Sequence, residues 1–462
     1  MLNHKPSSSF YHSHFPALLN PQQSQQLSIQ YQLDSSQWWS LEKIRSFQIK
    51  QAEIILQHAI KQVPFYKNFY EKKHFILPEK ITEESFLTIP IIERSDIQEA
   101  SSSFKANSLP EGITHLNEAS TSGSTGEPVT FSRDNHAHTF WLSFALREHL
   151  WHQRDFNLKL AAIRWFPKGS ALPPHGVSSD AWGSIVAPLF KTGPACSLNV
   201  TATLEEQITW LNYHKPDYLL SYPSNLKAIA DFAKKNQIPL PYIKEIRAIG
   251  ETLSSDNRKI IEGAWNTKLT DIYSCEETGY MATQCPSSNL MHIQSENVLF
   301  EIVDEMGLPV KPNETGFVVV TSLQNFSSPF IRYKIGDMAS FGEACNCGRN
   351  LPTLKFIHGR IRNRLYFPSG ESRFPYLGEL GQIEALTGVD VYQFQFIQHS
   401  VKLIELKLVA SRPFNNDEEE IVRSKIQENF GHPFDIQFSF VSDILKKSNG
   451  KFEEFISLVG SA

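Results

Sequence analysis

A run of hydroxyl side chains and glycines at residues 119–128 has the residue types of a phosphate-binding loop. It reads Ala-Ser-Thr-Ser-Gly-Ser-Thr-Gly-Glu-Pro. Glycines let backbone N–H groups approach an anion closely, and hydroxyl groups add further donors. The run is not a Walker loop, because it lacks the closing Gly-Lys-Ser/Thr and its glycine spacing. On its own such a run is more often an ordinary surface loop, so the other motifs decide its meaning.

Further motifs follow in chain order. Two of them end predicted strands, Ala-Ile-Gly-Glu at 248–251 and Asp-Ile-Tyr-Ser-Cys-Glu-Glu at 271–277. The others are Ile-Arg-Tyr-Lys-Ile-Gly-Asp at 331–337, Ile-His-Gly-Arg at 357–360 and Ile-Leu-Lys-Lys-Ser-Asn-Gly-Lys at 444–451. In this order they resemble the motif series of the adenylate-forming superfamily, which includes acyl-CoA synthetases, peptide-synthetase adenylation domains and luciferases.

The closest resemblance is to the phenylacetate–CoA ligase-like branch of that superfamily. The segments that suggest this branch are Val-Pro-Phe-Tyr at 63–66, Leu-Thr-Ile-Pro at 87–90, Ser-Pro-Phe-Ile-Arg-Tyr at 328–333 and Cys-Asn-Cys-Gly-Arg at 345–349. The resemblance runs from about residue 40 to about residue 455. Each motif is only moderately specific, but so many in the right order rarely arise by chance.

The resemblance implies how ATP would be held. The β- and γ-phosphates would lie on Thr121, Ser122, Gly123, Ser124, Thr125 and Gly126. Gly250 and Glu251 would flank the adenine ring, and Tyr273 would stack on it. Asp337 would accept hydrogen bonds from the ribose hydroxyls.

The resemblance also implies three catalytic residues. Glu277 would ligate Mg²⁺, and Arg360 would reach the ribose or phosphate from the start of an interdomain hinge. Lys451, on a loop of a mobile C-terminal domain, would bridge the substrate carboxylate and the α-phosphate. Attack of a carboxylate on phosphorus brings two anions together, and a metal ion and an ammonium group offset that charge. The plainer alternatives are a solvated Gly-Lys turn, a helix cap at Glu277 and a turn fixed by Asp337.

Several positions depart from the family pattern. Ser274 replaces a glycine, and Glu276 replaces the hydroxyl residue that usually touches the α-phosphate. Glu127 stands where a lysine is usual, and Arg362-Asn363 replaces an acidic pair. A second carboxylate beside phosphate repels it unless metal or protonation compensates. A nucleotide-binding relative with little catalytic activity therefore stays open as an alternative.

Four residues form a possible metal site, because three thiols and one imidazole are the ligand set of a closed tetrahedral zinc site. They are Cys285, His292, Cys345 and Cys347. A Cys-x-Cys pair in a cytosolic protein binds metal more often than it forms a disulfide. We predict a structural zinc ion, with unliganded thiols as the alternative. Cys196 and Cys275 are expected to be small buried side chains.

The residues that line the acyl pocket are the hardest to identify from the sequence. By analogy it is lined by Trp141, Tyr222, Ala248 and Ser274. Aromatic residues there favour a flat or apolar acid, although aromatic residues on a helix are core more often than pocket. The predicted substrate is a small carboxylic acid, with an aromatic acid as one option. The predicted products are an acyl-adenylate and pyrophosphate, followed by transfer to a thiol, with coenzyme A preferred over a carrier protein or an amine.

The elements that position these motifs alternate strand and helix through the middle of the chain. Strands are predicted at 158–166, 218–221, 246–249 and 269–273, and helices at 203–211, 224–232 and 255–264. Such alternation predicts layered α/β structure with parallel strands. The β-rich segment 291–322, with its Gly and Pro turns, predicts a smaller sheet or β-barrel-like part.

Three regions are predicted along the chain. Residues 1–36 form a polar lead-in without periodic apolar residues, followed by a long amphipathic helix at 41–63. Residues 37–359 form a large N-terminal α/β unit that binds ATP and the acid. Residues 360–462 form a small α+β lid domain, with a helix near 377–386, a hairpin at 392–408 and a helix at 417–430.

Composition excludes several other classes. The chain has 462 residues, and its 44 Lys and Arg against 49 Asp and Glu give a net charge of 44 − 49 = −5. No basic block indicates nucleic acid or an anionic membrane, and no apolar run approaches the ~20 residues of a membrane span. The N-terminus lacks an apolar signal core, and five cysteines suit a reducing compartment. We predict a cytoplasmic enzyme.

Overall fold

The computed structural model describes the chain as two compact units. The large unit is Met1–Ile357 and the small unit is His358–Ala462. The described residues are 6–10, 13, 15–100, 103–121, 128–375, 377, 383–444 and 451–459. The α/β class predicted for the large part and the α+β class predicted for the smaller C-terminal part are confirmed.

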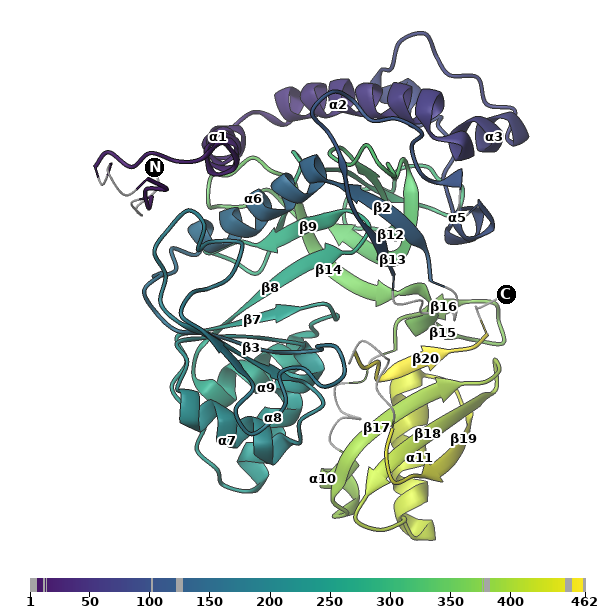
Figure 1. Ribbon diagram of the computed structural model, residues 1–462. Helices are drawn as coiled ribbons and strands as arrows, with labels where there is room; N and C mark the ends of the chain where they lie inside the picture. Colours follow the sequence, from purple (N-terminus) through teal and green to yellow (C-terminus); the bar gives the residue numbers. More distant parts are fainter. Residues whose placement is uncertain are drawn as a thin grey trace. The chain divides into compact units, whose positions relative to one another are not determined.

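Five parallel strands position most of the predicted motifs (Figure 1). They lie in the order β5-β3-β6-β7-β8, so their carboxyl ends share one edge of the sheet. Their bounds are β3 (Leu160–Arg164), β5 (Ala195–Asn199), β6 (Tyr218–Ser221), β7 (Glu245–Ile249) and β8 (Lys268–Cys275). A short strand, β4 (Val177–Ser179), closes this end of the sheet antiparallel to β5.

Three helices connect these strands and share a buried apolar core with them. They are α7 (Leu204–His214), α8 (Pro223–Lys235) and α9 (Ser255–Trp265). The predicted capping box opens α7, because Thr203 accepts a hydrogen bond from the Glu206 N–H while the Glu206 carboxylate accepts one from the Thr203 N–H. Proline at the first position of α8 starts that helix without a side-chain cap.

The β-rich segment continues the same sheet with antiparallel strands. Its strands are β9 (Gly279–Gln284), β10 (Met291–Ile293), β11 (Val298–Val303), β12 (Thr315–Ser322), β13 (Tyr333–Phe341) and β14 (Thr353–Arg360). The full order is β11-β12-β13-β14-β10-β9-β8-β7-β6-β3-β5-β4, a twelve-stranded sheet. This β-rich segment, predicted as a smaller sheet or β-barrel-like part, is continuous with the parallel strands, because β9 pairs antiparallel with β8.

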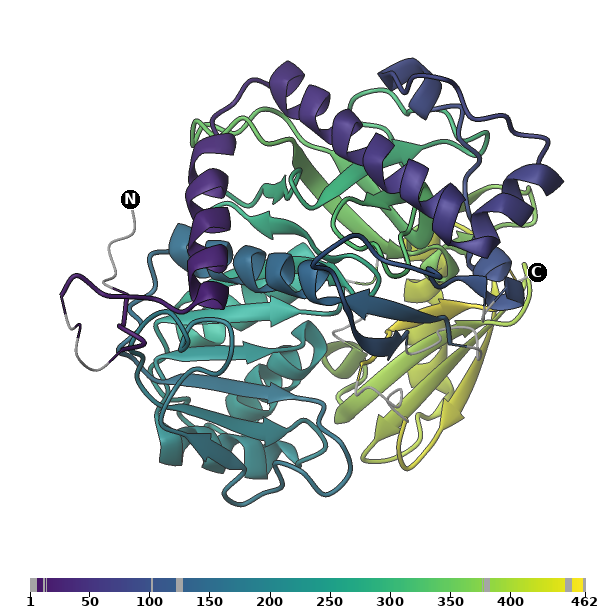
Figure 2. The ribbon, with the colours of Figure 1, turned by 45° about the horizontal axis from the view of Figure 1, so that its top comes forward.

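The N-terminal region contains more regular structure than the sequence indicated. The polar lead-in 1–36 includes α1 (Pro21–Ser36), which begins with a capping box at Asn20 and packs against α6 (Figure 2). Only Ile29 and Leu33 supply large buried apolar side chains on α1, and buried glutamines fill the rest of its inner face. Because this inner face is largely polar, the sequence shows no periodic apolar residues from which the helix could be predicted. The predicted amphipathic helix is α2 (Leu41–Gln62), which ends before Pro64.

The segment around the candidate phosphate loop forms a two-stranded hairpin followed by a long helix. β1 (His115–Ser120) pairs with β2 (Thr130–Asp134), and α6 (Asn135–Trp151) begins directly after β2. Asp134 caps α6 by accepting a hydrogen bond from the Ala137 N–H at 2.7 Å. The helices before β1 are α3 (Pro64–Lys72), α4 (Glu83–Phe86) and α5 (Arg94–Ala100).

The small unit has its own apolar core between one sheet and one helix. The sheet order is β19-β18-β17-β20, formed by β17 (Val391–Gln398), β18 (Leu403–Ala410), β19 (Asp435–Phe440) and β20 (Phe455–Ser457). Helix α11 (Asn416–Phe430) buries Val422, Ile426 and Phe430 in that core. The smaller elements are η2 (Ile361–Asn363), β15 (Leu365–Tyr366), β16 (Ser372–Arg373) and α10 (Ile383–Thr387). Part of the helix predicted at 377–386 lies outside the described residues.

A buried ionic cluster joins α6 to the strands that carry the site motifs. The Glu148 carboxylate of α6 accepts hydrogen bonds from Arg154 Nη2 and from Arg247 Nη2, each at 2.6 Å. Arg154 also contacts the Glu245 carboxylate at 2.7 Å. Burial raises the pKa of Glu148, but the charges of Arg154 and Arg247 outweigh burial and hold that pKa well below its usual range. Arg247 stands directly before the 248–251 motif, so the cluster fixes the strand that presents it.

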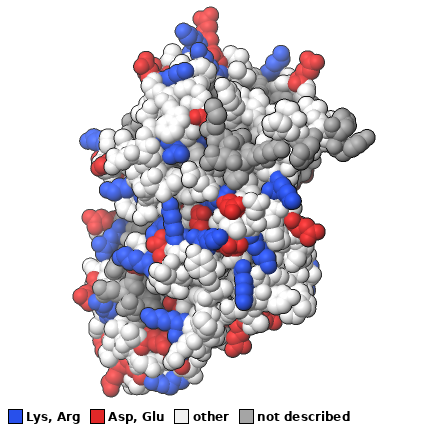
Figure 3. Space-filling view, turned by 90° about the vertical axis from the view of Figure 1, so that its left-hand side faces the viewer, with Lys and Arg blue, Asp and Glu red and all other residues white. Residues whose placement is uncertain are grey.

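The visible surface carries charges of both signs. On the face that Figure 3 shows, Lys and Arg side chains are interspersed with Asp and Glu side chains. Within the described part of the chain, no helix combines the length and apolar character that crossing a bilayer requires.

Replacing Glu148 with Gln should destabilise the large unit by about 3–5 kcal/mol, because the buried Arg247 loses its carboxylate partner and the buried Arg154 keeps only Glu245. Urea denaturation measures this change in the free energy of unfolding. Since the folded pKa of Glu148 is lowered, its contribution is present above the unfolded carboxyl pKa and disappears as the pH falls through the folded value. The difference between wild type and variant should therefore shrink at acid pH. Glu118→Gln, in an exposed pair with Lys105, is the control.

Candidate functional site

The candidate phosphate loop leaves the hairpin at Thr121. Residues Ser122, Gly123, Ser124, Thr125 and Gly126 lie outside the described residues, so their predicted role stays a prediction. Thr121 is buried, and its hydroxyl accepts hydrogen bonds from Arg94 Nη2 at 2.7 Å and from the Val129 N–H at 3.0 Å. Both ends of the loop are thus held together, with a guanidinium from α5 at its first residue.

The end of β7 places the 248–251 motif beside the start of α8. Ala248 is fully buried in β7, and Gly250 follows with φ +77°, a conformation that favours glycine. The Glu251 carboxylate accepts a hydrogen bond from the Ser224 N–H in the first turn of α8 at 2.9 Å. Tyr222, which precedes that helix, is buried, and its hydroxyl accepts a hydrogen bond from the Trp165 N–H at 3.2 Å.

A hydrogen bond joins two residues predicted to bind the nucleoside. Tyr273 on β8 donates its hydroxyl to Asp337 Oδ2 on β13 at 2.8 Å. Asp337 is 9% exposed. Burial raises the pKa of the neighbouring Cys275 thiol, and the charges of Glu277 and Asp337 raise it further. Asp337, distant in sequence, is thus brought to the strand end that carries Tyr273 and precedes Glu277.

The turn between β8 and β9 shows how Glu276 is compensated. Arg133, on β2, donates from Nη2 to the Glu276 carboxylate at 2.5 Å and to the Glu276 backbone carbonyl at 2.6 Å. The sequence departure at Glu276 thus coincides with a cation that sequence analysis had not selected. A carboxylate in a phosphate site implies a nearby positive charge, but only the tertiary structure shows which side chain supplies it.

Two predicted pocket residues lie near this turn. Trp141 on α6 is 37% exposed and stacks on His138, with ring centroids 5.7 Å apart. A Cβ atom at Gly279, which has φ +76°, would lie 3.1 Å from the Trp141 ring, so glycine lets the two elements approach closely. Ser274 is on β8 at a register shift in its pairing with β9. Burial and the charge of Arg133 lower the pKa of His138.

The small unit contains the other two predicted catalytic residues. Arg360 ends β14, and Lys451 follows the undescribed residues 445–450. Arg362, another departure from the family pattern, pairs with both carboxylate oxygens of Glu453 at 2.5 and 2.6 Å. This pair holds the segment two residues after Lys451 against η2. Glu453 was not selected from the sequence, because a lone glutamate near a C-terminus carries no signal.

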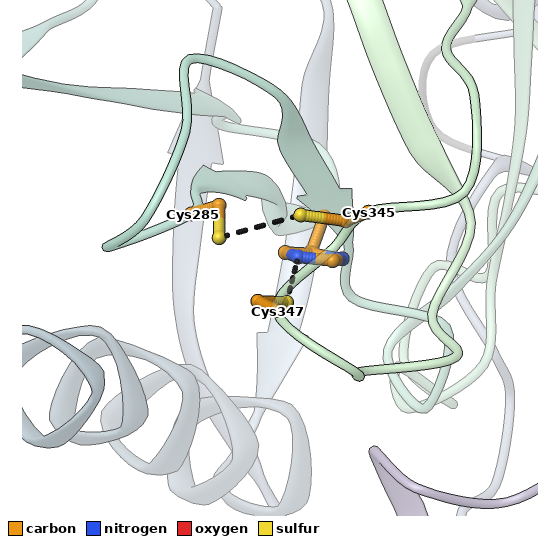
Figure 4. Close-up of side chains that lie close together, drawn as sticks. Cys285, Cys345 and Cys347 are labelled. Carbon is orange, nitrogen blue, oxygen red and sulfur yellow. Dashed lines mark hydrogen bonds between the residues drawn. The ribbon is translucent and has the colours of Figure 1, made fainter.

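The four predicted metal ligands converge (Figure 4). Their ligand atoms all lie within 4.8 Å of one another. Cys285 Sγ and Cys345 Sγ are 3.6 Å apart, and Cys347 Sγ lies 3.2 Å from His292 Nε2. Tetrahedral zinc with bonds of about 2.3 Å to sulfur places its ligands about 3.8 Å apart. The donor set and its spacing therefore fit a four-coordinate zinc ion.

The surroundings of His292 favour metal binding through Nε2. His292 Nδ1 lies 3.2 Å from the Leu351 carbonyl oxygen, an acceptor that fixes the proton on Nδ1 and leaves Nε2 to face the thiols. Burial lowers the pKa of His292 to about 4, so the imidazole is neutral at pH 7. Burial raises the pKa of the Cys285 thiol, an effect that a bound cation would reverse.

Comparison with known proteins finds one matching family description and two relatives. The protein-family description "CapK C-terminal domain" matches residues 379–457. Protein CapK from Staphylococcus aureus is 23% identical over 398 residues, covering 82% of each chain. An uncharacterized acyl-CoA ligase, YhfT, from Bacillus subtilis (strain 168) is 27% identical over 214 residues, covering 45% of this chain and 41% of that relative.

Solved structures give the fold. A 2-hydroxyisobutyryl-CoA ligase in the postadenylation state with R3-HIB-AMP aligns at TM-score 0.68 and 18% identity, covering 91% of this chain and 90% of that one. The anthranilate-CoA ligase AuaEII with anthranoyl-AMP aligns at TM-score 0.50 and 16% identity, covering 75% and 67%. This chain has the fold of the adenylate-forming ligases. The superfamily resemblance is confirmed at the level of fold, and the phenylacetate–CoA ligase-like branch stays a prediction.

On this adenylate-forming fold, the large unit brings together Tyr273 and Asp337, the two residues predicted to bind the nucleoside. Thr121, at the base of the phosphate loop, is held by Arg94. In the large unit, Arg94 and Arg133 are two residues near these motifs that the sequence did not indicate. Each lies outside the motif segments, so no spacing rule could have selected it.

Replacing Tyr273 with Phe tests the nucleoside pair. The variant keeps the ring but removes a hydrogen bond to a buried carboxylate, which should lower the free energy of unfolding by about 1–3 kcal/mol. Urea denaturation measures the change. Tyr213→Phe is the control, because that side chain is 74% exposed. Equal stability of Tyr273→Phe and wild type would show that the hydrogen bond contributes nothing.

Proposed function

We propose that this protein is an acid–thiol ligase that uses ATP to activate a carboxylic acid and then transfers the acyl group to coenzyme A. One observation carries the proposal: the Tyr273–Asp337 hydrogen bond, with Glu277 beside it, on the fold of the adenylate-forming ligases. This supports the proposal because the ring proposed for adenine contacts the carboxylate proposed for ribose, and the proposed magnesium ligand follows on the turn where β8 ends. Ligands of open parallel sheets bind at the carboxyl ends of the strands, which is where this group lies.

The nucleotide would be bound mainly by the large unit. Tyr273 stacks on the adenine, flanked by Gly250 and Glu251, and Asp337 accepts hydrogen bonds from the ribose hydroxyls. The loop that begins at Thr121 holds the β- and γ-phosphates through its backbone N–H groups and hydroxyls. The hydrogen bond from Tyr273 orients the Asp337 carboxylate before ATP arrives.

Glu277 fits a magnesium ligand. Mg²⁺ in phosphate-transfer sites is usually held by one or two carboxylates, with phosphate oxygens and water completing the octahedron. Bound there, the ion would offset negative charge on the phosphates.

The proposed first step joins the acid to the nucleotide. A carboxylate oxygen attacks the α-phosphorus, the bond from that phosphorus to the bridging oxygen breaks, and pyrophosphate leaves. Lys451 bridges the attacking carboxylate and the α-phosphate, and Arg360 contacts the ribose or phosphate. An ammonium group suits this role as a compact point charge at one oxygen–phosphorus junction. The Arg362–Glu453 pair holds the Lys451 segment in place.

The proposed second step forms the thioester. The thiol of coenzyme A attacks the acyl carbon, its proton goes to solvent, and the carbon–oxygen bond to AMP breaks. The named neighbours with bound acyl-AMP support this order for their own substrates. For this chain we propose a small acid bound near Trp141, Tyr222, Ala248 and Ser274, within the phenylacetate–CoA ligase-like branch. The partly exposed Trp141 ring beside Gly279 offers an aromatic face for a flat acid.

Replacing Lys451 with Ala should lower the rate of acid-dependent ATP–pyrophosphate exchange by about 10²–10³-fold, the effect of removing one positioned transition-state contact. ATP affinity should stay within about threefold, because the lysine acts on the reacting oxygens. The assay covers a panel of aryl and short acyl acids, with AMP formation as a second readout. Lys402→Ala, an exposed lysine on the β17–β18 turn, is the control.

Near-wild-type exchange by Lys451→Ala would contradict the assigned role of that lysine. ATP binding without exchange for any acid by the wild type would instead favour a nucleotide-binding protein with little turnover. The sequence departures at Ser274, Glu276 and Arg362 motivate that second candidate. Mass spectrometry of products with coenzyme A present or absent tests the acceptor.

We also propose that Cys285, His292, Cys345 and Cys347 hold a structural zinc ion. Four protein ligands leave no open position, so the ion would link two loops and take no part in the reaction. Its binding free energy would add to the stability of the large unit, because the unfolded chain has no preformed site.

Purified protein should contain about one zinc ion per chain by elemental mass spectrometry. The double variant Cys345→Ser/Cys347→Ser should lose that zinc and melt at a lower temperature, because half of the ligand set is removed. Cys196→Ala, a buried thiol outside the cluster, should retain the metal. Metal-free protein whose melting temperature does not change on zinc addition would contradict the proposal.

A further inference from the structure

We infer that Arg133 faces the phosphates of the bound nucleotide. Its guanidinium neutralises Glu276 and supplies positive charge to the α-phosphate. This inference rests on the proposed function. Its basis is the contact of Arg133 Nη2 with both the carboxylate and the backbone carbonyl of Glu276. The pair connects the strand that follows the phosphate loop with the turn that carries Glu277.

The electrostatic need for such a cation is clear from the turn. Glu276 and Glu277 are consecutive, and Asp337 acts on the same neighbouring thiol as Glu277. Three carboxylates beside three phosphate groups repel the nucleotide unless positive charge intervenes. Magnesium held by Glu277 would offset part of this charge. Arg133 is the cation that the structure places on Glu276 itself.

The backbone holds Arg133 in position. Arg133 pairs with Asn117 across the β1–β2 hairpin, and the Thr121 N–H donates to the Val129 carbonyl where the loop leaves that hairpin. The guanidinium carbon lies 5.4 Å from the centroid of the Phe131 ring. Sheet pairing and the ring together limit where the side chain can point.

The guanidinium has donors beyond those that Glu276 uses. Both hydrogen bonds to Glu276 come from Nη2, and a guanidinium carries five N–H groups in a planar fork. Within the described residues, Arg133 donates hydrogen bonds to Glu276 alone. Among the described residues, Nη1 and Nε have no acceptor, and we propose that they face a second anion while Nη2 keeps the carboxylate neutralised, a geometry suited to phosphate.

The plain alternative is a surface ion pair of little consequence. The Arg133 side chain is 31% exposed and the Glu276 side chain 63%. Pairs this exposed contribute little to folding stability. Stability measurements therefore cannot separate the two interpretations. Nucleotide affinity can, because mutating the pair changes the affinity only if the pair faces the phosphates.

The test measures Mg-ATP affinity by calorimetry for wild type, Arg133→Gln, Glu276→Thr and the double variant. Arg133→Gln should weaken binding about tenfold or more, because it leaves the Glu276 carboxylate uncompensated beside the phosphates. Glu276→Thr should bind ATP more tightly than wild type, because a repelling charge is removed. The double variant should recover most of the loss, since it contains neither the carboxylate nor its cation.

Arg45→Gln is the matched control, because Arg45 forms a similarly exposed pair with Glu83 at side-chain exposures of 26% and 54%. It should bind ATP as wild type does. Arg133→Lys should fall between wild type and Arg133→Gln, since it keeps the charge but loses the fork. Equal affinity of Arg133→Gln and wild type would overturn the inference, as would a double variant as weak as Arg133→Gln.

Failure of the proposed function gives a different result. Wild-type protein that binds no Mg-ATP would overturn both the proposed function and this inference. Wild-type protein that binds Mg-ATP but exchanges pyrophosphate with no acid would overturn the activity alone. The binding cycle would then still decide whether Arg133 faces the phosphates.

Discussion

Removing a carboxylate from water is unfavourable by several kcal/mol unless cations or donors face it, and this constraint recurs throughout the large unit. Glu148 lies fully buried between Arg154 and Arg247. Arg332 similarly faces Glu301 at 2.9 Å. These pairs tie helices and loops to the central sheet at points fixed by geometry. They also set the position of the strand ends from which the proposed site is built.

The proposed nucleotide site extends the same rule to its own carboxylates. Asp337 accepts a hydrogen bond from Tyr273, and Glu276 is faced by Arg133. Glu277 is the carboxylate of this group suited to a metal ion. An adenylate-forming site must gather acidic groups to bind magnesium and ribose, yet must also receive a triphosphate and a second anion. Local compensation of each carboxylate reconciles the two requirements.

The small unit and the cysteine cluster show two further ways of holding a segment in place. Arg362 donates hydrogen bonds to both oxygens of the Glu453 carboxylate, and this pair anchors the chain near Lys451. In the cysteine cluster, side-chain atoms from two loops and from strand β10 converge within 4.8 Å. A metal ion there would replace an extensive apolar contact between those loops. Both arrangements keep functional segments in position without enlarging a core.

The sequence by itself determined the α/β class, the bounds of β6 (Tyr218–Ser221) and the four members of the cysteine–histidine cluster, because periodicity, caps and residue types act locally. It did not determine helix α1, whose inner face is polar, or the joining of the β-rich segment to the parallel sheet. Partners of charged side chains were likewise decided only by the tertiary structure. Arg133 and Glu276 are 143 residues apart, and no local pattern records which strand and turn will meet.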